Sequence, residues 1–359
     1  MQAMANHTTD APSLCLSKTV RFFFPETFIM FSNNSTFDAR LAFEMSPLEQ
    51  VVRCMQVFIV PILSSLGILG SLFCCVVFLK TRLRKKFYSH FLVCVSASSG
   101  GFLSTVMTTW LNGQGVDVYN APGLCQIVVF SSHFFPLLTF WSTLIGAYLI
   151  LWDSLKPRSL AWMNSSSTAK CIIIAMAICG FTMYSYKTWT NGTVSVQGYR
   201  VCSVLPENEA AMAVLNVLDI LFLLIVPSVF FFVFDMLFLI TKMSGRCKIH
   251  KSQCSKRHRE VMKLVLAHSI CFHILVTPRG VSMLAFIANR WIYGVFPTFN
   301  EILTQQVFQF LFYAYFAVLP YLPLLMSEKF RFYLLLLLGF RPARRRCGLY
   351  PMRRQPSFL

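Results

Sequence analysis

The chain has 359 residues, of which 56% are hydrophobic and only 13% are charged. Soluble domains carry about 25% charged residues, so a soluble surface built from this chain would expose large apolar patches. The composition therefore excludes an ordinary soluble protein and indicates a membrane-embedded chain. The sequence shows no nucleophile motif, phosphate-binding loop, dinucleotide fingerprint or metal-ligand set, so we expect no enzyme, no metal and no cofactor.

The net charge of +18 is concentrated in a few segments. Of the 32 Lys and Arg residues, 24 fall in the segments 80–86, 153–170, 242–263 and 327–359, which lie between or after the apolar spans. Basic loops of this kind lie on the cytoplasmic side of membrane proteins. The charge therefore predicts contact with anionic membrane lipids, and it requires no nucleic-acid partner.

Residues 1–50 are polar and lack a basic start followed by an apolar core, so we expect an extracellular N-terminus without a cleavable signal peptide. Asn6, Asn33 and Asn34 each begin an N-x-S/T sequon in this segment. Asn191 begins another sequon in the loop after the fourth apolar span. We expect glycans on these four asparagines if they face the extracellular side.

Seven apolar spans follow, each near the ~20 residues that cross a bilayer. Their approximate bounds are 55–79, 88–111, 123–152, 170–187, 211–241, 261–288 and 302–326. Most are apolar on all sides, which predicts helices rather than the alternating strands of a barrel. The expected fold class is an all-α membrane protein, a seven-transmembrane helix bundle over residues 51–326. The basic segments place the N-terminus outside and the C-terminus in the cytoplasm.

Two further segments follow the last span. Residues 327–340 have a charged start and an apolar body too short to span, which predicts an amphipathic helix on the inner surface. Residues 341–359 form a basic, proline-broken tail that we expect to be cytoplasmic and disordered. In that tail Cys347, beside three arginines, is a candidate for palmitoylation. Ser357 and Leu359 fit a C-terminal peptide for a PDZ-domain partner, although a tail without a partner is the favoured interpretation.

Residues at characteristic places in the spans follow a recognisable order. The matching residues are Cys125 at the start of the third span, Cys202 after the fourth, Pro157, Pro227, Phe272, Pro278, and the strings Leu319-Pro320 and Ser327–Arg331. Over residues 50–340 this order resembles the rhodopsin-like G-protein-coupled receptors. The resemblance implies a plasma-membrane receptor for an extracellular ligand, coupled to heterotrimeric G proteins, with a Cys125–Cys202 disulfide. Cys15 and Cys54 form a second candidate outer pair.

The chain departs from that family where the family keeps its polar switch. Ile150 stands in place of the Arg of Asp-Arg-Tyr, Val276 in place of the sixth-span Trp, and Pro320 and Pro323 lie where Asn-Pro-x-x-Tyr is usual. The predicted switch positions are Ile150, Asp235, Phe272, Val276, Pro278, Pro320 and Pro323. For Asp235 we consider two roles, a latch to Lys263 or His268 on the sixth span, or an interfacial side chain that reaches water.

The resemblance places the ligand pocket among the outer halves of the third, fifth, sixth and seventh spans. Candidate ligand residues are Ser132, His133, Arg279 and Gln305. Amine receptors carry an Asp where this chain has Ser132, so a lipid or peptide ligand is favoured over an amine. Arg279, directly after Pro278, either faces an anionic ligand group, or reaches the interface, or pairs with Asp219 or Glu301.

Three hypotheses about function therefore stand. The first is a receptor that binds an extracellular ligand of unknown identity and signals to a heterotrimeric G protein. The second is a non-signalling seven-helix protein, such as a ligand scavenger, a receptor partner subunit or a trafficking adaptor, which the missing switch motifs favour. The third, a channel or transporter, is disfavoured because we find neither internal repeats nor an ordered series of charges across the spans.

Overall fold

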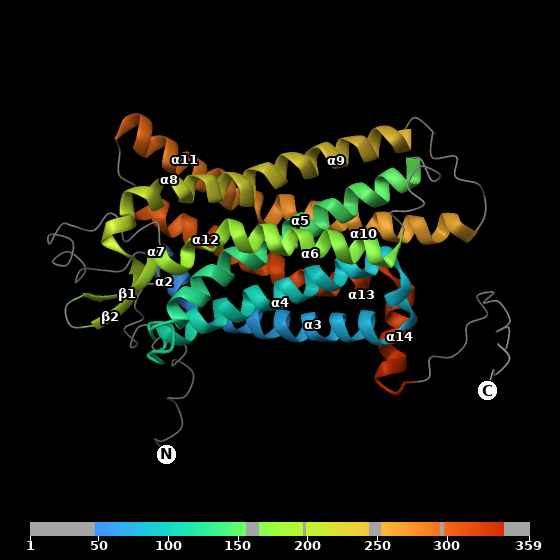
Figure 1. The fold of residues 1–359 in the computed structure, drawn as a ribbon, viewed down its shortest axis with the longest axis horizontal. Coiled ribbons are helices and arrows are strands. Elements are labelled where there is room, and N and C mark those ends of the chain that lie inside the picture. Colours follow the sequence, from blue (N-terminus) through green and yellow to red (C-terminus); the bar gives the residue numbers. More distant parts are fainter. Residues whose placement is uncertain (1–46, 156–164, 197–198, 244–252, 295–297, 341–359) are drawn as a thin grey trace, which may run out of the picture.

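The computed structural model describes residues 47–155, 165–196, 199–243, 253–294 and 298–340. Seven helical spans lie side by side in one bundle (Figure 1), and each is long and apolar enough to cross a membrane. A β-hairpin, formed by β1 (Asn191–Val196) and β2 (Tyr199–Val204), lies at one end of the bundle, and the helix α14 (Glu328–Leu337) lies at the other. We refer to these as the hairpin end and the α14 end. The expected fold class is confirmed.

The spans are longer than predicted, and several consist of consecutive helical segments. The first four contain α2 (Pro47–Cys54), a π-helical turn (Met55–Ile59), α3 (Val60–Lys80), α4 (Phe87–Gly113), α5 (Leu124–Leu155), α6 (Ser166–Tyr184) and α7 (Lys187–Thr190). The last three contain α8 (Glu209–Ile220), a π-helical turn (Leu221–Ile225), α9 (Val226–Met243), α10 (Gln253–Leu275), α11 (Thr277–Tyr293), α12 (Phe299–Val318), a 3₁₀ turn (Leu319–Tyr321) and α13 (Leu322–Met326). Short 3₁₀ turns at Arg82–Lys85 and Pro206–Asn208 precede α4 and α8.

The irregular turns coincide with prolines. The π-helical turn of the fifth span directly precedes Pro227, which lies in the first turn of α9. In the sixth span α10 and α11 are separated at Val276, and Pro278 is the second residue of α11. Pro320 lies inside the 3₁₀ turn of the seventh span. Because proline lacks the N–H group and crowds the preceding turn, these residues interrupt the regular α-helix.

Aromatic residues fill the centre of the bundle. Phe140 of α5 contacts Phe272 of α10 with ring centroids 5.0 Å apart, and Tyr315 of α12 lies 5.6 Å from Phe140 and 5.8 Å from Phe272. All three side chains are fully buried. Large apolar side chains also lie exposed along the outer faces, among them Leu72, Ile174, Ile178, Phe232 and Ile240. Such a surface is stable against lipid and not against water.

The first, second and seventh spans pack at very short range around Gly67 of α3. A Cβ atom at this position would collide with the side chain of Leu103 and lie 2.9 Å from the Cα atom of Ala317. Tyr321 lies one helical turn after Ala317 in the seventh span, and its hydroxyl donates a 2.8 Å hydrogen bond to the carbonyl of Leu66, next to Gly67. Glycine therefore sets the distance between α3 and α12.

The helix expected over residues 327–340 is present as α14 (Glu328–Leu337), which runs across the end of the bundle (Figure 1). Among the described residues of α14, only Phe330 is buried. Its ring contacts that of Phe78 of α3, with ring centroids 5.3 Å apart. Arg331 donates a hydrogen bond of 3.1 Å to the carbonyl of Leu325 at the end of α13. The remaining leucines at its C-terminal end are exposed, as in a helix that lies on a membrane surface.

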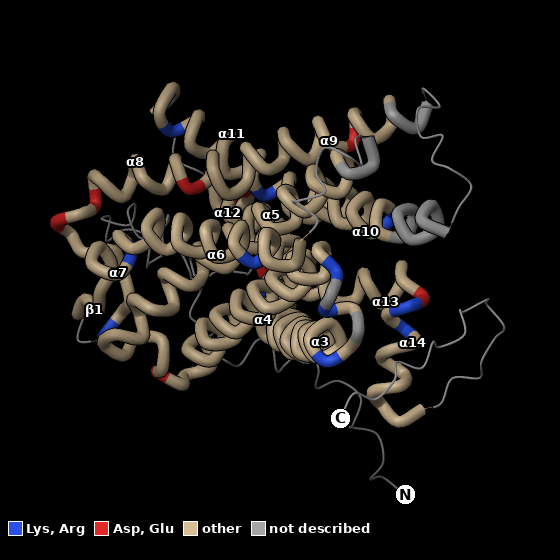
Figure 2. Tube along the Cα trace, turned by 45° about the vertical axis from the view of Figure 1, so that its right-hand side comes forward, with Lys and Arg blue, Asp and Glu red and all other residues tan. Residues whose placement is uncertain are grey.

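Charged residues divide between the two ends (Figure 2). Among the described residues, Lys80, Arg84, Lys170, Lys329 and Arg331 lie at the α14 end. The hairpin end carries most of the described acidic residues, including Asp117, Glu207, Glu209 and Glu301. The asymmetry expected from the sequence is therefore present between the two ends of the bundle.

Candidate ligand-binding site

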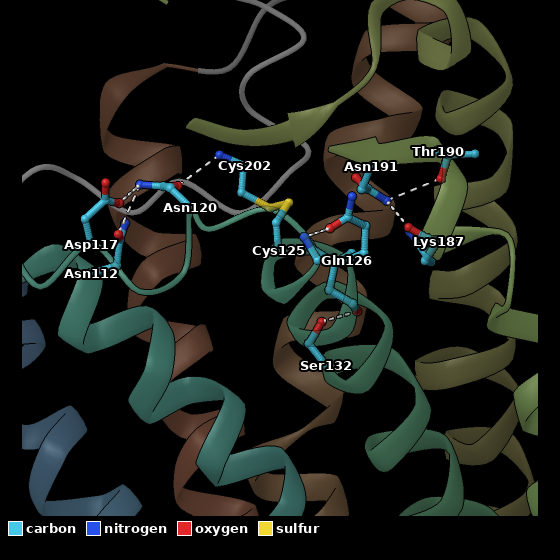
Figure 3. The surroundings of a disulfide bond; sticks show 12 residues. Asn112, Asp117, Asn120, Cys125, Gln126, Ser132, Lys187, Thr190, Asn191 and Cys202 are labelled. Atoms are coloured by element: carbon cyan, nitrogen blue, oxygen red, sulfur yellow. Dashed lines mark hydrogen bonds between the residues drawn. A yellow bond between two sulfur atoms is a disulfide. The ribbon is translucent and has the colours of Figure 1, made fainter. Parts of the chain in front are cut away.

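A disulfide fixes the hairpin to the third span (Figure 3). Cys125, in the first turn of α5, is bonded to Cys202 of β2 (Tyr199–Val204), and their Cα atoms are 5.6 Å apart. The side-chain oxygen of Asn120 accepts a 3.0 Å hydrogen bond from the backbone N–H of Cys202, and its nitrogen donates to Asp117 at 2.7 Å. The expected pairing is confirmed. The hairpin is attached to the third span by the disulfide, and Asn120 adds a hydrogen bond to its backbone.

The first strand, β1 (Asn191–Val196), pairs antiparallel with β2 and places Asn191 in a buried position. Only 1% of this residue is exposed, and its side-chain nitrogen donates to the carbonyl of Lys187 at 3.1 Å and to the hydroxyl of Thr190 at 3.3 Å. A glycan must be attached to that same nitrogen. The structure therefore disfavours the glycosylation that the sequon at Asn191 predicted.

A buried ionic network joins the fourth and fifth spans next to the hairpin. The ammonium group of Lys187 lies 3.1 Å from the carboxylate of Asp219, and 0% of the Lys187 side chain is exposed. Lys187 also donates to the side-chain oxygen of Asn216 at 3.0 Å, and the hydroxyl of Tyr186 donates to Asp219 at 2.9 Å. Because both charges have additional hydrogen bonds, the cost of removing them from water is offset.

A cavity of about 490 Å³ lies beside this network, at the hairpin end. Its apolar walls come from Ala213, Val217 and Ile220 of α8 and from Met283, Phe286 and Ile287 of α11. Glu207, Glu209, Asn216, Arg290 and Gln305 add polar groups. This volume lies within the 300–1,000 Å³ typical of ligand pockets, which are mostly apolar with a few polar groups. Asn216 belongs both to the cavity wall and to the ionic network.

Of the four predicted ligand residues, only Gln305 of α12 lines this cavity. Ser132 donates its hydroxyl to the carbonyl of Val129 on its own helix at 2.8 Å. His133 lies 3.0 Å from the same carbonyl, and its ring faces Tyr184 of α6 at 5.6 Å between centroids. The structure thus directs these two side chains toward α5 itself and toward the fourth span, and it does not bring the four residues into one site.

Arg279 is the fourth predicted ligand residue, and it lies in the first turn of α11. Its guanidinium carbon is 4.3 Å from the ring centroid of Phe312, and its Nε atom is buried without a hydrogen-bond partner. Asp219 pairs with Lys187, and the Glu301 carboxylate accepts a 2.8 Å hydrogen bond from the N–H of Thr298 at the start of α12. Both acidic partners considered from the sequence are therefore wrong.

No protein-family model matches the chain, and no curated protein matches it. The similarity to rhodopsin-like receptors therefore rests on the order of the cysteines, prolines and helical spans within this sequence.

Five cavity residues on the sixth span were not predicted from the sequence. They are Met283, Phe286, Ile287, Arg290 and Trp291. Their spacing of three and four residues places them on one face of a helix, and Arg279 lies four residues before Met283 on the same face. This periodicity was available in the sequence.

Several of the predicted switch residues are packed among mainly apolar side chains. Ile150 lines a small cavity of about 30 Å³ together with Val261, Leu264 and Val265 of α10. Phe272 and Val276 are fully buried in the core. Of the two predicted prolines in the seventh span, Pro320 lies in the 3₁₀ turn and Pro323 in the first turn of α13, both buried.

Asp235 of α9 is joined to the sixth span, but not through the residues expected. The hydroxyl of Ser269 donates to its carboxylate at 2.7 Å, and the ring nitrogen of His273 lies 3.6 Å from the same oxygen. His268 instead faces the carbonyl of Leu264 on its own helix at 2.8 Å, and Lys263 is exposed. The polar link between the fifth and sixth spans exists, and the predicted partners Lys263 and His268 are wrong.

The remaining predicted sites fall in terminal segments outside the described residues. These are the sequons at Asn6, Asn33 and Asn34, Cys15 of the second candidate disulfide, Cys347, and the tail residues Ser357 and Leu359. They stay predictions from the sequence.

Proposed function

We propose that this protein is a plasma-membrane receptor that binds an extracellular ligand in the cavity between α8, α11 and α12. Binding there would change the packing of the fifth and sixth spans and so alter contacts with a heterotrimeric G protein at the α14 end. The observation that carries the proposal is the cavity itself, which lies at the hairpin end and is walled by three spans. Ligands of helix bundles commonly bind between helices in this way.

Two features support an extracellular hairpin end. The Cys125–Cys202 disulfide lies there, and disulfides persist in oxidising compartments. Most of the described basic residues that flank the spans, such as Arg84 and Lys170, lie at the α14 end, although Arg53, Arg200 and Arg290 lie at the hairpin end. This excess of positive charge fits the cytoplasmic side and its anionic lipids. The exposed leucines of α14 would then rest on the inner leaflet.

The cavity favours a lipid or a peptide as the ligand class. Its walls are formed mainly by aliphatic and aromatic side chains of α8 and α11, with polar groups concentrated toward the hairpin end. The two carboxylates that line the cavity, Glu207 and Glu209, lie before and at the start of α8, away from the apolar walls. An amphipathic molecule would match this distribution better than a small, strongly hydrated cation.

The sixth span supplies a route from the cavity to the α14 end. The cavity residue Met283 lies on α11, and α11 is separated from α10 by the interruption at Val276. On the other side of that interruption, Ser269 and His273 hold α10 against Asp235 of α9. A ligand that shifts α11 would therefore act on this polar link, which would replace the family's polar switch.

Basal G-protein activation tests the proposal. The full chain would be expressed in cells with each Gα class in turn, at surface levels matched to an inactive membrane protein. We expect activation above the empty-vector control in at least one class. The variant Ala213→Phe, which fills the cavity, is expected to change that activity, whereas Ile178→Phe on the exposed face of α6 leaves it unchanged.

One observation favours the non-signalling alternative. The α14 end is closed around Ile150 by apolar side chains, and the pivoting arginine of signalling receptors is missing there. Silence in every Gα class at matched surface expression would favour a scavenger or a partner subunit. Proximity labelling from the C-terminus would then identify the cytoplasmic partners, among them any PDZ-domain protein that binds Ser357 and Leu359.

A further inference from the structure

Arg279 places a positive charge deep inside the sixth span. It is the third residue of α11, which ends at Tyr293 near the hairpin end. At 1.5 Å per residue the two positions are roughly 20 Å apart, too far for an arginine side chain to reach the membrane surface. Its Nε atom is buried without a hydrogen-bond partner, although the residue as a whole retains some accessible surface.

The carboxylates of the described residues do not neutralise this charge. Within the spans, Asp219 is paired with Lys187, Asp235 accepts from Ser269, and Glu301 caps its own helix. No ion pair joins Arg279 to any carboxylate in the described part of the chain. The ring of Phe312 contributes a cation–π contact, which offsets only part of the cost of burying a charge.

Arg279 also continues one wall of the cavity. Met283, one turn nearer to the hairpin end on the same face of α11, is a wall residue. On α12, Gln305 lines the cavity, and Gln309 and Tyr313 follow at intervals of one helical turn on the same face of the helix. Polar groups on α12 therefore run along the helix from the cavity wall toward the guanidinium.

We propose that Arg279 binds the acidic group of an amphipathic carboxylate whose apolar body lies along Met283, Phe286 and Ile287. This rests on the proposed function, because it takes the cavity as the ligand site. At the hairpin-end side of the cavity Arg290 lies together with Glu207 and Glu209, whose two carboxylates oppose an anion there, so the acidic group of the ligand is directed to Arg279. A planar guanidinium binds a carboxylate through two parallel hydrogen bonds, which makes it the best-suited cation for this task.

The test measures thermal unfolding of the purified full chain in detergent, with oleate as the carboxylate probe and oleyl alcohol as its uncharged counterpart. Wild type is compared with Arg279→Gln and with Arg84→Gln, which removes an exposed charge at the α14 end. We expect oleate to raise the unfolding temperature of wild type and Arg84→Gln by several degrees and oleyl alcohol to raise it less. Arg279→Gln should lose this difference and, without any probe, unfold at a higher temperature than wild type.

Two results would overturn the proposal: equal shifts by oleate and oleyl alcohol in wild type, or an oleate-specific shift that survives in Arg279→Gln. If Arg279→Gln does not fold, displacement of a fluorescent fatty acid by oleate is measured in wild type and Arg279→Lys. Weaker displacement in Arg279→Lys supports the proposal, and equal displacement contradicts it.

Inorganic anions form a separate arm of the same experiment. Chloride is exchanged for gluconate without any fatty acid present. If chloride alone raises the unfolding temperature, this effect depends on Arg279, and oleate raises the temperature no further, then the anion that binds Arg279 is a solvent ion. That result would overturn the carboxylate proposal. These measurements need no G protein. If oleate raises the unfolding temperature through Arg279 in a protein that activates no G protein, only the proposed G-protein coupling is refuted. G-protein activation without that shift would refute only the ligand class.

Discussion

Lys187 and Asp219 form an ion pair of 3.1 Å in the interior, between the hairpin and the cavity. Lys187 belongs to the short helix that leads into β1, and Asp219 belongs to α8, which forms a cavity wall. The pair therefore connects the disulfide-linked hairpin to the fifth span. Its position makes it a structural support of the candidate ligand site rather than a member of it.

We expect Lys187→Met to destabilise the protein, since it leaves the Asp219 carboxylate buried and uncompensated. Breaking a buried pair in this way costs about 3–5 kcal/mol. Thermal unfolding of the purified variant measures the effect. The double variant Lys187→Met with Asp219→Asn should recover part of the loss, and a double variant as unstable as the single one would show that the pairing is not what stabilises this region.

Cys202→Ala should abolish surface expression, because the hairpin loses its covalent link to α5. Loss of a native disulfide typically costs about 2–5 kcal/mol. Surface labelling of an N-terminal tag gives the measurement. Cys179→Ala, which changes an exposed cysteine on α6, serves as the matched control and should leave surface levels unchanged. Normal surface levels of Cys202→Ala would contradict the assigned role of the bridge.

Gly67→Ala should weaken the packing between α3 and α12. The added methyl group collides with Leu103 and presses on the backbone at Ala317, which cannot move aside as a flexible side chain can. Overpacking of this kind costs about 1–3 kcal/mol. Thermal unfolding again measures the change, with Gly113→Ala as control because nothing lies within 4 Å of a Cβ atom there. Equal stability of the two variants would refute the close packing.

Asn191→Gln should leave the glycan content unchanged, because the Asn191 nitrogen is buried and bonded to Lys187 and Thr190. The electrophoretic shift on enzymatic deglycosylation measures this directly. Variants of Asn6, Asn33 and Asn34 provide the positive controls expected from their sequons. A smaller deglycosylation shift in Asn191→Gln than in wild type would mean that this loop is glycosylated after all.

Ser269→Ala should raise basal G-protein activation, given the proposed function, because it removes one of the hydrogen bonds that join α10 to Asp235. A hydrogen bond to a charged group contributes roughly 1.5 kcal/mol, which changes the ratio of two states about tenfold. The assay is the Gα scan at matched surface expression. Ser104→Ala, an exposed serine that bonds only to its own helix among the described groups, is the control. Unchanged activity in Ser269→Ala would exclude the link as a switch.

Composition and apolar patterning were enough to predict the membrane setting and the seven helical spans, and the resemblance to rhodopsin-like receptors implied the Cys125–Cys202 pair. Hydrophobicity over about 20 residues is a local property, and in lipid it leaves helices as the only available structure for such segments. The surface helix after the seventh span was equally local, since its charged start and apolar body lie within residues 327–340. The interruptions near Val276 and Pro320 also lie at prolines, although Pro136 lies inside the uninterrupted helix α5.

Which side chains meet depends on how the helices pack in three dimensions. Asp235 has several basic and polar residues within reach along the sixth span, and the rotation of α10 about its axis selects Ser269 and His273 over Lys263 and His268. Asp219 and Lys187 lie 32 positions apart, and their pairing removes Asp219 as a partner for Arg279. Helix rotation and spacing depend on packing over the whole bundle, and no local pattern of residues encodes them.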